Sequence, residues 1–507
     1  SYRCEAMSSM ADSNLADTLK EIDLCIRAGR LGDGRAKLRA ISPKVITKNL
    51  RAHYARLSWR LGLAELGLRA LAYTIREDRQ ASPEERAEYA ACLNSIGSTQ
   101  EAHMLLLSEE SPCAWTSLYT AFTQISMWDY SGAGQTLERL LETPNLVNEL
   151  PSYNRLVARV NRLACLIVDE SWDHATTEWN ELYRVISKEN HTRLLANLQE
   201  LRLQLLYGTK QFKKARTLIE KSSNLEGPER LHYLKWSTLV ETAGDKNAGP
   251  ERLIALKDLA LREQRWEMVR DLETRLALHF KNPLFLKRVL YATPWPKYRA
   301  RLLKQFAQPV ELTATFDYRF LPEEHELKQS GIRNRGAWYE VSLDTDRIAH
   351  DLTLKEGFLS YRTMRALTAD LYRSHSVGSL FGTLFPNEHY NPFSSPGRVH
   401  HAIGDLRDEL AAAGTPLSID QIHGRYRLST AKPTVLHLPL SVATDKTGLR
   451  IEKLAWKFGA QHFQVSDAAS ALALNEKAAQ RLLKDAVESG YLVRTGNGKA
   501  TRYHITS

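Results

Sequence analysis

Residues 1–306 carry apolar side chains at helical spacing, and strand-like alternation is almost absent there. Short breaks of Gly, Pro or Asn separate the apolar stretches. We therefore predict helical hairpins in series over this region. Strand-like alternation begins after residue 309, where it is mixed with amphipathic segments, so the second part is predicted to be α+β. The expected fold class is mainly α.

A small residue recurs through the first region at intervals of 31 to 42 residues. The recurring positions are Ala36, Ala70, Ala102, Ala133, Ala175 and Ala215. Tyr130, Trp172 and Phe212 lie three positions before three of these alanines. Two antiparallel helices approach closely only where a small side chain lies at their crossing, and a bulky neighbour then fills the groove to the next pair. The pattern predicts stacked helical hairpins with these alanines at the crossings.

This pattern resembles the tetratricopeptide repeat. The unit that matches best contains Tyr89, Ala90, Leu93, Gly97, Ala102 and Leu106. Near Trp266 the match is degenerate, because Val269 stands where alanine is expected. The resemblance implies an N-terminal α-solenoid over residues 1–306 whose concave face binds a protein or peptide partner. The open alternative is that the stack serves as a dimerisation platform or spacer.

The next region, residues 309–430, has a distinctive order of elements. Strands are predicted at 310–320 and 337–345, helices at 351–372, 376–385 and 398–414, and a hairpin at 416–429. This order resembles the winged-helix output domain of OmpR-type response regulators. Three motifs carry the resemblance: Leu352, Thr353 and Glu356; Val399, Ile403, Leu406, Arg407 and Leu410; and Gly424, Tyr426, Arg427 and Leu428.

The OmpR-like resemblance implies that the helix at 398–414 meets DNA. The residues that it nominates for DNA contact are Arg398, His401, Arg407, His423 and Arg425. Asp405, Asp408 and Glu409 on the same helix would repel phosphates. Retention of this region for protein contact or dimerisation is therefore the open alternative. No pattern of a receiver domain precedes it, so control by phosphorylation of a receiver is not expected.

The last region, residues 447–507, predicts three helices and a hairpin. The helices are expected at 447–459, 463–474 and 475–490, with Ser466 and Asn475 as N-caps of the second and third and Gly490 ending the third. The apolar side of the third helix is Ala479, Leu482, Leu483, Ala486 and Val487. The stretch "GNGK", 496–499, is the tip of the hairpin and not a phosphate loop, because Val493 and Ala500 replace the required glycine and hydroxyl.

This last region resembles the winged helix-turn-helix of many bacterial repressors. The residues that carry the resemblance are Leu472, Ala479, Arg481, Leu482, Gly490, Tyr491, Leu492 and Tyr503. The third helix could enter a major groove, where Gln and Arg read base edges. The candidate DNA contacts are Lys477, Gln480, Arg481 and Lys484 on the helix and Arg494, Asn497, Lys499 and Arg502 on the hairpin. A solvated basic face on a protein-contact module is the alternative.

Composition adds little that is specific. The formal net charge is +10 over 507 residues, and the last 61 residues hold nine Lys and Arg against five Asp and Glu. No apolar run reaches the roughly 20 residues needed to span a bilayer. Five scattered cysteines, Cys4, Cys25, Cys92, Cys113 and Cys165, are expected to be free thiols in a reducing compartment. We find no catalytic set and no metal-binding spacing, and we expect neither a cofactor nor enzymatic activity.

These observations predict a cytoplasmic bacterial transcriptional regulator that binds double-stranded DNA and can form a homo-oligomer. The expected domains are helical repeats at 1–306, an OmpR-like winged helix at 309–430, a linker at 431–446 and a second winged helix-turn-helix at 447–507. The repeats would bind a protein or peptide. The rival interpretation is a non-catalytic scaffold or adaptor whose repeats and winged helices make only protein–protein contacts.

Overall fold

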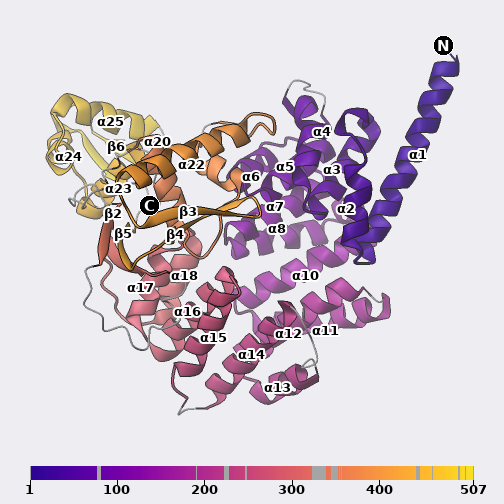
Figure 1. The fold of residues 1–507 in the computed structure, drawn as a ribbon, viewed down its shortest axis with the longest axis horizontal. Helices are drawn as coiled ribbons and strands as arrows, with labels where there is room; N and C mark the ends of the chain where they lie inside the picture. The colour runs from indigo at the N-terminus through magenta and orange to yellow at the C-terminus, as the bar shows by residue number, and fades with distance from the viewer. Residues whose placement is uncertain are drawn as a thin grey trace. The chain divides into compact units, whose positions relative to one another are not determined.

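The protein is mainly helical, with small sheets in its second half (Figure 1). The computed structural model describes residues 2–76, 81–189, 191–221, 228–245, 248–322, 338–343, 352, 354, 357–386, 388–440, 446–459, 461–488, 491–496 and 498–505. Side chains are described from residue 14 onward, except at 228, 229, 446, 456 and 499. The chain divides into two compact units. The first comprises Ser1–Lys281, Trp295–Phe306 and His375–Val399, and the second comprises Asn282–Pro294, Ala307–Ser374 and His400–Ser507.

The first unit is built of helices, most of which pack on their sequence neighbours. They are α1 (Tyr2–Arg27), α2 (Leu31–Arg39), α3 (Arg51–Arg60), α4 (Ala64–Arg76), α5 (Pro83–Ser95), α6 (Thr99–Leu107), α7 (Ala114–Ser126), α8 (Tyr130–Glu142), α9 (Pro144–Val147), α10 (Ser152–Val168), α11 (Trp172–Glu189), α12 (Thr192–Gly208), α13 (Phe212–Lys221), α14 (Pro228–Gly244), α15 (Glu251–Arg262), α16 (Trp266–Phe280), α18 (Pro296–Phe306) and α21 (Val377–Leu384). Along the chain α3 packs on α4, α5 on α6 and α7 on α8, while α3 also packs on α5 and α5 on α7.

A left-handed turn recurs between paired helices. The residues with positive φ in these turns are Gly29, Gly62, Gly97, Trp128, Glu170, Lys210 and Gln264. The amide of the next residue then donates to the carbonyl five positions before it, as Ser98 N does to Leu93 O at 2.9 Å. This bond belongs to the Schellman motif, which satisfies carbonyls at a helix end. The sharp turn sends the chain into the following helix.

The turn also sets the register of the small residues. The residues five positions after each left-handed residue are Gly34, Gly67, Ala102, Ala133, Ala175, Ala215 and Val269, and all are buried. The prediction of Ala36 at a crossing is therefore wrong, whereas Ala70 is buried three residues after Gly67. Ala36 is exposed. At Gly67 a Cβ would lie 2.7 Å from the Cys92 Sγ, so this glycine is the close crossing.

A buried polar cluster joins three helices of the first unit. The Glu88 carboxylate on α5 is fully buried and accepts hydrogen bonds from Arg56 Nε (2.6 Å), Tyr119 OH (2.8 Å) and Trp59 Nε1 (3.1 Å). The Arg56 guanidinium also lies 3.6 Å from the centroid of the Trp115 ring. Each partner comes from α3 or α7, so the carboxylate cross-links α3, α5 and α7. Removal of Arg56 would leave the buried Glu88 carboxylate without its counterion.

The second unit contains a three-stranded sheet whose central strand was not expected. β5 (Thr434–Pro439) pairs antiparallel with β1 (Thr315–Phe320) and parallel with β2 (Tyr339–Ser342). The predicted linker at 431–446 is thus wrong over 434–439. The physical reason is that alternate residues of this short segment are apolar, so Leu436 and Leu438 are buried on one face of a strand. The same unit includes α17 (Pro283–Tyr291) and α20 (Leu359–Ala369).

Helix α22 (Ser395–Ala412) runs from the first unit into the second. Its predicted apolar stripe is confirmed, because Val399, Ile403, Leu406 and Leu410 are all buried. The predicted hairpin follows as β3 (Leu417–Ile422) and β4 (Arg425–Thr430), which pair antiparallel. Of the motif at the start of the predicted region, Leu352 is buried, whereas Thr353 and Glu356 lie outside the described residues.

The C-terminal residues form α23 (Lys446–Phe458), α24 (Val465–Ala471), α25 (Glu476–Glu488) and the antiparallel strands β6 (Leu492–Thr495) and β7 (Arg502–Ile505). The predicted cap of α25 is confirmed, since Asn475 Oδ1 accepts from the Ala478 amide at 2.8 Å. The predicted Ser466 cap of α24 is wrong. The cap is Gln464, two residues earlier, and the Asp467 carboxylate accepts from the Gln464 amide at 2.7 Å. Gly490 lies outside the described residues.

Candidate functional site

One face of α25 presents the predicted DNA-contact residues of the third helix. Lys477, Gln480, Arg481 and Lys484 are all exposed. The opposite face is buried, with Ala479, Leu482, Leu483 and Ala486 inside and Val487 partly covered. Residues 477, 481 and 484 follow the spacing that places side chains on one side of a helix. The helix therefore carries a cationic stripe directed away from its own core.

Acidic side chains border this stripe. Glu476, Asp485 and Glu488 on α25 are also exposed. The Lys484 Nζ lies 3.8 Å from the Glu488 Oε1, with both side chains mostly exposed. An exposed pair of this kind contributes little energy and is easily exchanged for another partner. The stripe is accordingly free to meet an anion, but α25 as a whole has no excess of positive charge.

The hairpin places its predicted contacts unequally. Arg494 in β6 is exposed, whereas Arg502 in β7 is half-buried. The Gln464 side chain faces the Arg502 guanidinium. With the Gln464 side-chain amide rotated by 180°, its oxygen accepts hydrogen bonds from that guanidinium. Lys499 lies in a 3-10 turn, Gly498–Ala500, and its side chain is not described; Asn497 lies outside the described residues.

The arginines predicted for the first winged helix contact the chain itself. Arg398 makes a bidentate ion pair with Glu388, with Nη2 donating to Oε1 at 2.9 Å, and its guanidinium lies 3.9 Å from the Phe385 ring centroid. Arg407 donates to the Ile419 carbonyl from Nε (3.2 Å) and Nη2 (2.7 Å). Both side chains therefore already hold neighbouring segments in place.

The β3–β4 hairpin divides the remaining predicted contacts in the same way. Arg425 donates from Nη2 to the Ser374 carbonyl at 2.8 Å and from Nε to the Ser374 hydroxyl at 3.1 Å. His423 and Gly424 form the two-residue tip, both with positive φ, as in a type I′ turn. His423 is exposed, as is His401 on α22. Only these two histidines of the five predicted contacts have no hydrogen bond or ion pair among the described side chains.

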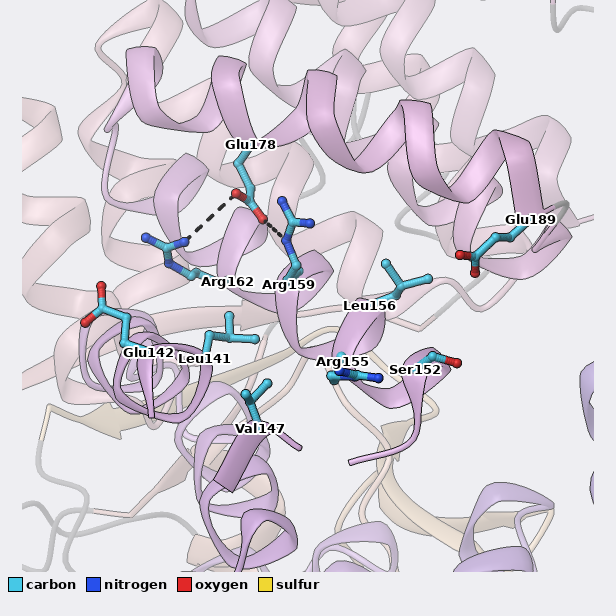
Figure 2. A pocket seen from close by; sticks show the side chains of 10 residues that line it. All are labelled: Leu141, Glu142, Val147, Ser152, Arg155, Leu156, Arg159, Arg162, Glu178 and Glu189. Atoms are coloured by element: carbon cyan, nitrogen blue, oxygen red, sulfur yellow. Dashed lines mark hydrogen bonds and ion pairs between the residues drawn. The ribbon is translucent and has the colours of Figure 1, made fainter. Parts of the chain in front are cut away.

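The first unit also contains a pocket of about 480 Å³ between α8, α9, α10 and α11 (Figure 2). Three arginines of α10, Arg155, Arg159 and Arg162, lie along it. Glu178 of α11 accepts a hydrogen bond at Oε1 from Arg159 Nε at 2.7 Å, and its Oε2 lies 3.9 Å from Arg162 Nη1. Figure 2 shows Arg159 and Arg162 turned toward Glu178, with Arg155 beside Ser152. Sequence reasoning did not identify this pocket, because the carboxylates that line it come from other helices.

The charges of the pocket largely cancel. Arg159 also meets Glu181 (2.9 Å), and Arg162 meets Glu138 (3.0 Å). Glu142 and Glu189 complete the acidic part of the lining. The arginines are thus engaged in structural ion pairs, apart from Arg155, which makes none with the described residues.

The buried cysteines are unsuited to nucleophilic work. Cys25, Cys92 and Cys165 are buried, and the four cysteines with described side chains are free thiols. Burial raises the pKa of Cys92 well above its usual value, and burial raises the pKa of Cys165 to about 12. A thiol with a raised pKa stays protonated and is a poor nucleophile.

Two further structural facts bear on location and ligands. Among the described helices, none combines the length and the apolar character needed to cross a bilayer. Within the described ranges, no group of three or more His, Cys, Asp or Glu side chains is arranged to hold a metal ion.

Comparison with known proteins does not place the chain in a family: no protein-family model matches it, and no curated protein matches its sequence.

Proposed function

We propose that the chain is a DNA-binding transcriptional regulator, with its main DNA contact on α25 and the β6–β7 hairpin. The observation that carries this proposal is the exposed stripe of Lys477, Arg481 and Lys484, with Gln480 beside it, on a helix whose opposite face is buried. A helix of this kind fits a major groove, where lysine and arginine neutralise phosphates and glutamine reads an adenine edge. Exposed Arg494 on the hairpin extends the same cationic surface.

The helical order of the first unit supports a repeat array of the tetratricopeptide kind. Its support comes from the recurring left-handed turn and from the buried small residue five positions later. In this proposal the array is an α-solenoid that binds a protein or peptide, and the two C-terminal α+β regions are winged helices. The OmpR-like region would then position the second winged helix, because its own arginines are occupied by the chain.

The experiment measures binding of the full chain to labelled genomic duplex DNA by fluorescence polarisation at several salt concentrations. The variant K477Q/R481Q/K484Q removes the stripe. The matched control, K213Q/K214Q/R216Q, removes three exposed positive charges from α13. We expect the α25 variant to lose about a hundredfold or more in affinity and to flatten the salt dependence by two to three units of slope. The α13 control should change neither quantity by much.

An adaptor function is the second candidate, and one observation favours it. Arg398, Arg407 and Arg425 all contact the chain itself, so the predicted basic residues of the first winged-helix region are already held by contacts within the protein. Under this alternative, the α25 variant and the α13 control would bind DNA equally weakly. That result would contradict the regulator proposal and favour a scaffold.

A further inference from the structure

A segment distant in sequence lies on the helical array of the first unit. Residues 375–399, which contain α21 and the start of α22, belong to the same compact unit as α4, α5 and α6. α21 packs on α6. The Ser376 hydroxyl donates to the Ile96 carbonyl at 2.5 Å, at the left-handed turn that contains Gly97. A Cβ on Gly378 would lie 2.4 Å from that same carbonyl, so only glycine fits there.

Tyr390 is the anchor of this segment. Its side chain is fully buried, and its hydroxyl donates to Glu65 Oε1 at 2.6 Å. Its amide donates to Glu101 Oε2 at 2.9 Å. Its carbonyl accepts from Arg76 Nη2 and from the Tyr89 hydroxyl. Every polar group of one residue is therefore bound by side chains of α4, α5 and α6, as a ligand is bound by a receptor.

The surroundings of Tyr390 are much less tightly held. The neighbouring His389 side chain is 84% exposed, and Phe393 is 69% exposed. The Arg69 guanidinium lies 5.7 Å from the Phe393 ring centroid, which is a weak contact at an exposed site. Residues 388–394 are attached to the helices mainly through Tyr390, with one further contact of 3.3 Å between His389 Nδ1 and Glu101 Oε1. The recess that holds Tyr390 is named the tyrosine seat (Glu65, Arg76, Tyr89 and Glu101).

One oxygen of the seat has no hydrogen-bond partner. The second carboxylate oxygen of Glu65 is buried and has no hydrogen-bond partner. Burial raises the pKa of Glu65, although the hydrogen bond from Tyr390 acts in the opposite direction. A buried oxygen without a partner costs free energy whenever the seat is closed. Around the seat, α4 packs on α5 and α5 packs on α6, so these helices contact one another as well as Tyr390.

We propose that the tyrosine seat is a recognition site for a tyrosine in an extended segment, occupied in this state by Tyr390 of the chain itself. A protein partner that presents such a tyrosine competes with residues 388–394 and releases the start of α22. This inference deepens the proposed role of the helical array in binding a partner, and it does not depend on DNA binding. The intrachain ligand has a high effective concentration, so a partner must overcome that advantage.

The test uses a labelled peptide of residues 375–399 and the full chain, with fluorescence anisotropy as the readout. In the wild-type chain the seat is occupied, so the peptide should bind weakly. In the Tyr390→Ala chain the seat is vacant, and the peptide should bind about tenfold more tightly or better. The matched control is Tyr73→Ala, which removes a tyrosine of α4 that is 70% exposed and should leave weak binding unchanged.

Specificity for the tyrosine is tested on both sides of the contact. A peptide with Tyr390→Ala should not bind the vacant seat, and adding Glu101→Ala to the vacant-seat chain should abolish binding of the unchanged peptide. Equal binding by the wild-type and Tyr390→Ala chains would overturn the proposal. Equal binding of the two peptides would do so as well. Because no DNA is present, failure here is distinct from failure of the proposed regulator function.

Hydrogen exchange on the wild-type chain covers the case in which Tyr390→Ala fails to fold. An exchangeable seat predicts that the Tyr390 amide, bonded to Glu101, exchanges much faster than the amides of α5. Protection of the Tyr390 amide equal to that of α5 would show a permanently closed contact and would overturn the proposal.

Discussion

Helices α22 and α25 both bury one apolar stripe, but they differ in what their cationic side chains contact. On α22, Arg398 is paired with Glu388 and Arg407 is bound to the Ile419 carbonyl. On α25, Lys477 and Arg481 are exposed and have no ion pair among the described residues. The two helices look alike as sequence patterns, since each places basic residues outside a run of apolar ones.

The difference teaches that the availability of a charge depends on acceptors from other elements. Arg407 finds a carbonyl of β3, and Arg425 finds Ser374, because those groups lie within reach after folding. An arginine with such partners would have to break hydrogen bonds before it could bind a phosphate. The side chains of α25 that face solvent have no such cost.

The largest expected effect concerns what the two helices share. Leu406 on α22 and Leu483 on α25 are both fully buried. Leu406→Ala and Leu483→Ala should each destabilise their region by about 2–5 kcal/mol, because each leaves a cavity. Urea denaturation combined with hydrogen exchange of the helix amides measures this loss. The control Leu284→Ala, at a residue that is 55% exposed, should cost within about 0.5 kcal/mol. A loss at Leu483 as small as the control would contradict the described core of the C-terminal region.

The next effect separates the helices by DNA binding. Arg481→Gln should weaken DNA binding by about five- to tenfold near 0.1 M salt and reduce the salt slope by about one. Arg407→Gln should leave both quantities unchanged, since its guanidinium is held by Ile419. Polarisation titrations at a series of salt concentrations measure both variants. If Arg407→Gln had the larger effect, the comparison between the helices would be reversed.

The smallest expected effect is a difference between the two helices in how much each arginine contributes to the free energy of unfolding. Arg407→Gln removes two hydrogen bonds to the Ile419 carbonyl and should lower the free energy of unfolding by about 0.5–1.5 kcal/mol. Arg481→Gln touches no described partner and should change it by less than about 0.5 kcal/mol. Denaturant midpoints of the two variants and the wild-type chain, compared at one protein concentration, provide the measurement. Equal midpoints for the two variants would remove the distinction between held and free arginines.

The positions of the helices and their buried faces follow from local sequence pattern, but the residues at which paired helices cross do not. Apolar periodicity predicted the buried faces of α22 and α25, and Asn475 was recognised as a cap. The crossing residues Gly34 and Gly67 were missed because Ala36 and Ala70 satisfy the same spacing within a few positions. The signal that fixes the register is the left-handed turn five residues earlier, and most turns use residues other than glycine, such as Trp128 and Lys210.

The partners of the candidate site could not be read from sequence, because they depend on contacts between distant segments. Tyr390 and Glu65 are separated by more than 300 residues, and no local pattern connects them. The exposure of Arg481 followed from its place opposite an apolar stripe. The engagement of Arg425 did not, since its acceptor Ser374 comes from a loop before α21. Sequence pattern therefore predicts whether a side chain lies on the buried or the exposed face of its helix, whereas its hydrogen-bond partners depend on the tertiary fold.

The central place of β5 has a practical consequence for dividing the protein. A fragment that stops at residue 430 would keep β1 and β2 but lose the strand that joins them. Two bare strand edges would then offer their amides and carbonyls to other copies, which is a common route to insoluble material. A fragment that starts at residue 446, where α23 begins, leaves that sheet intact in the remaining piece, so the division should be made before α23.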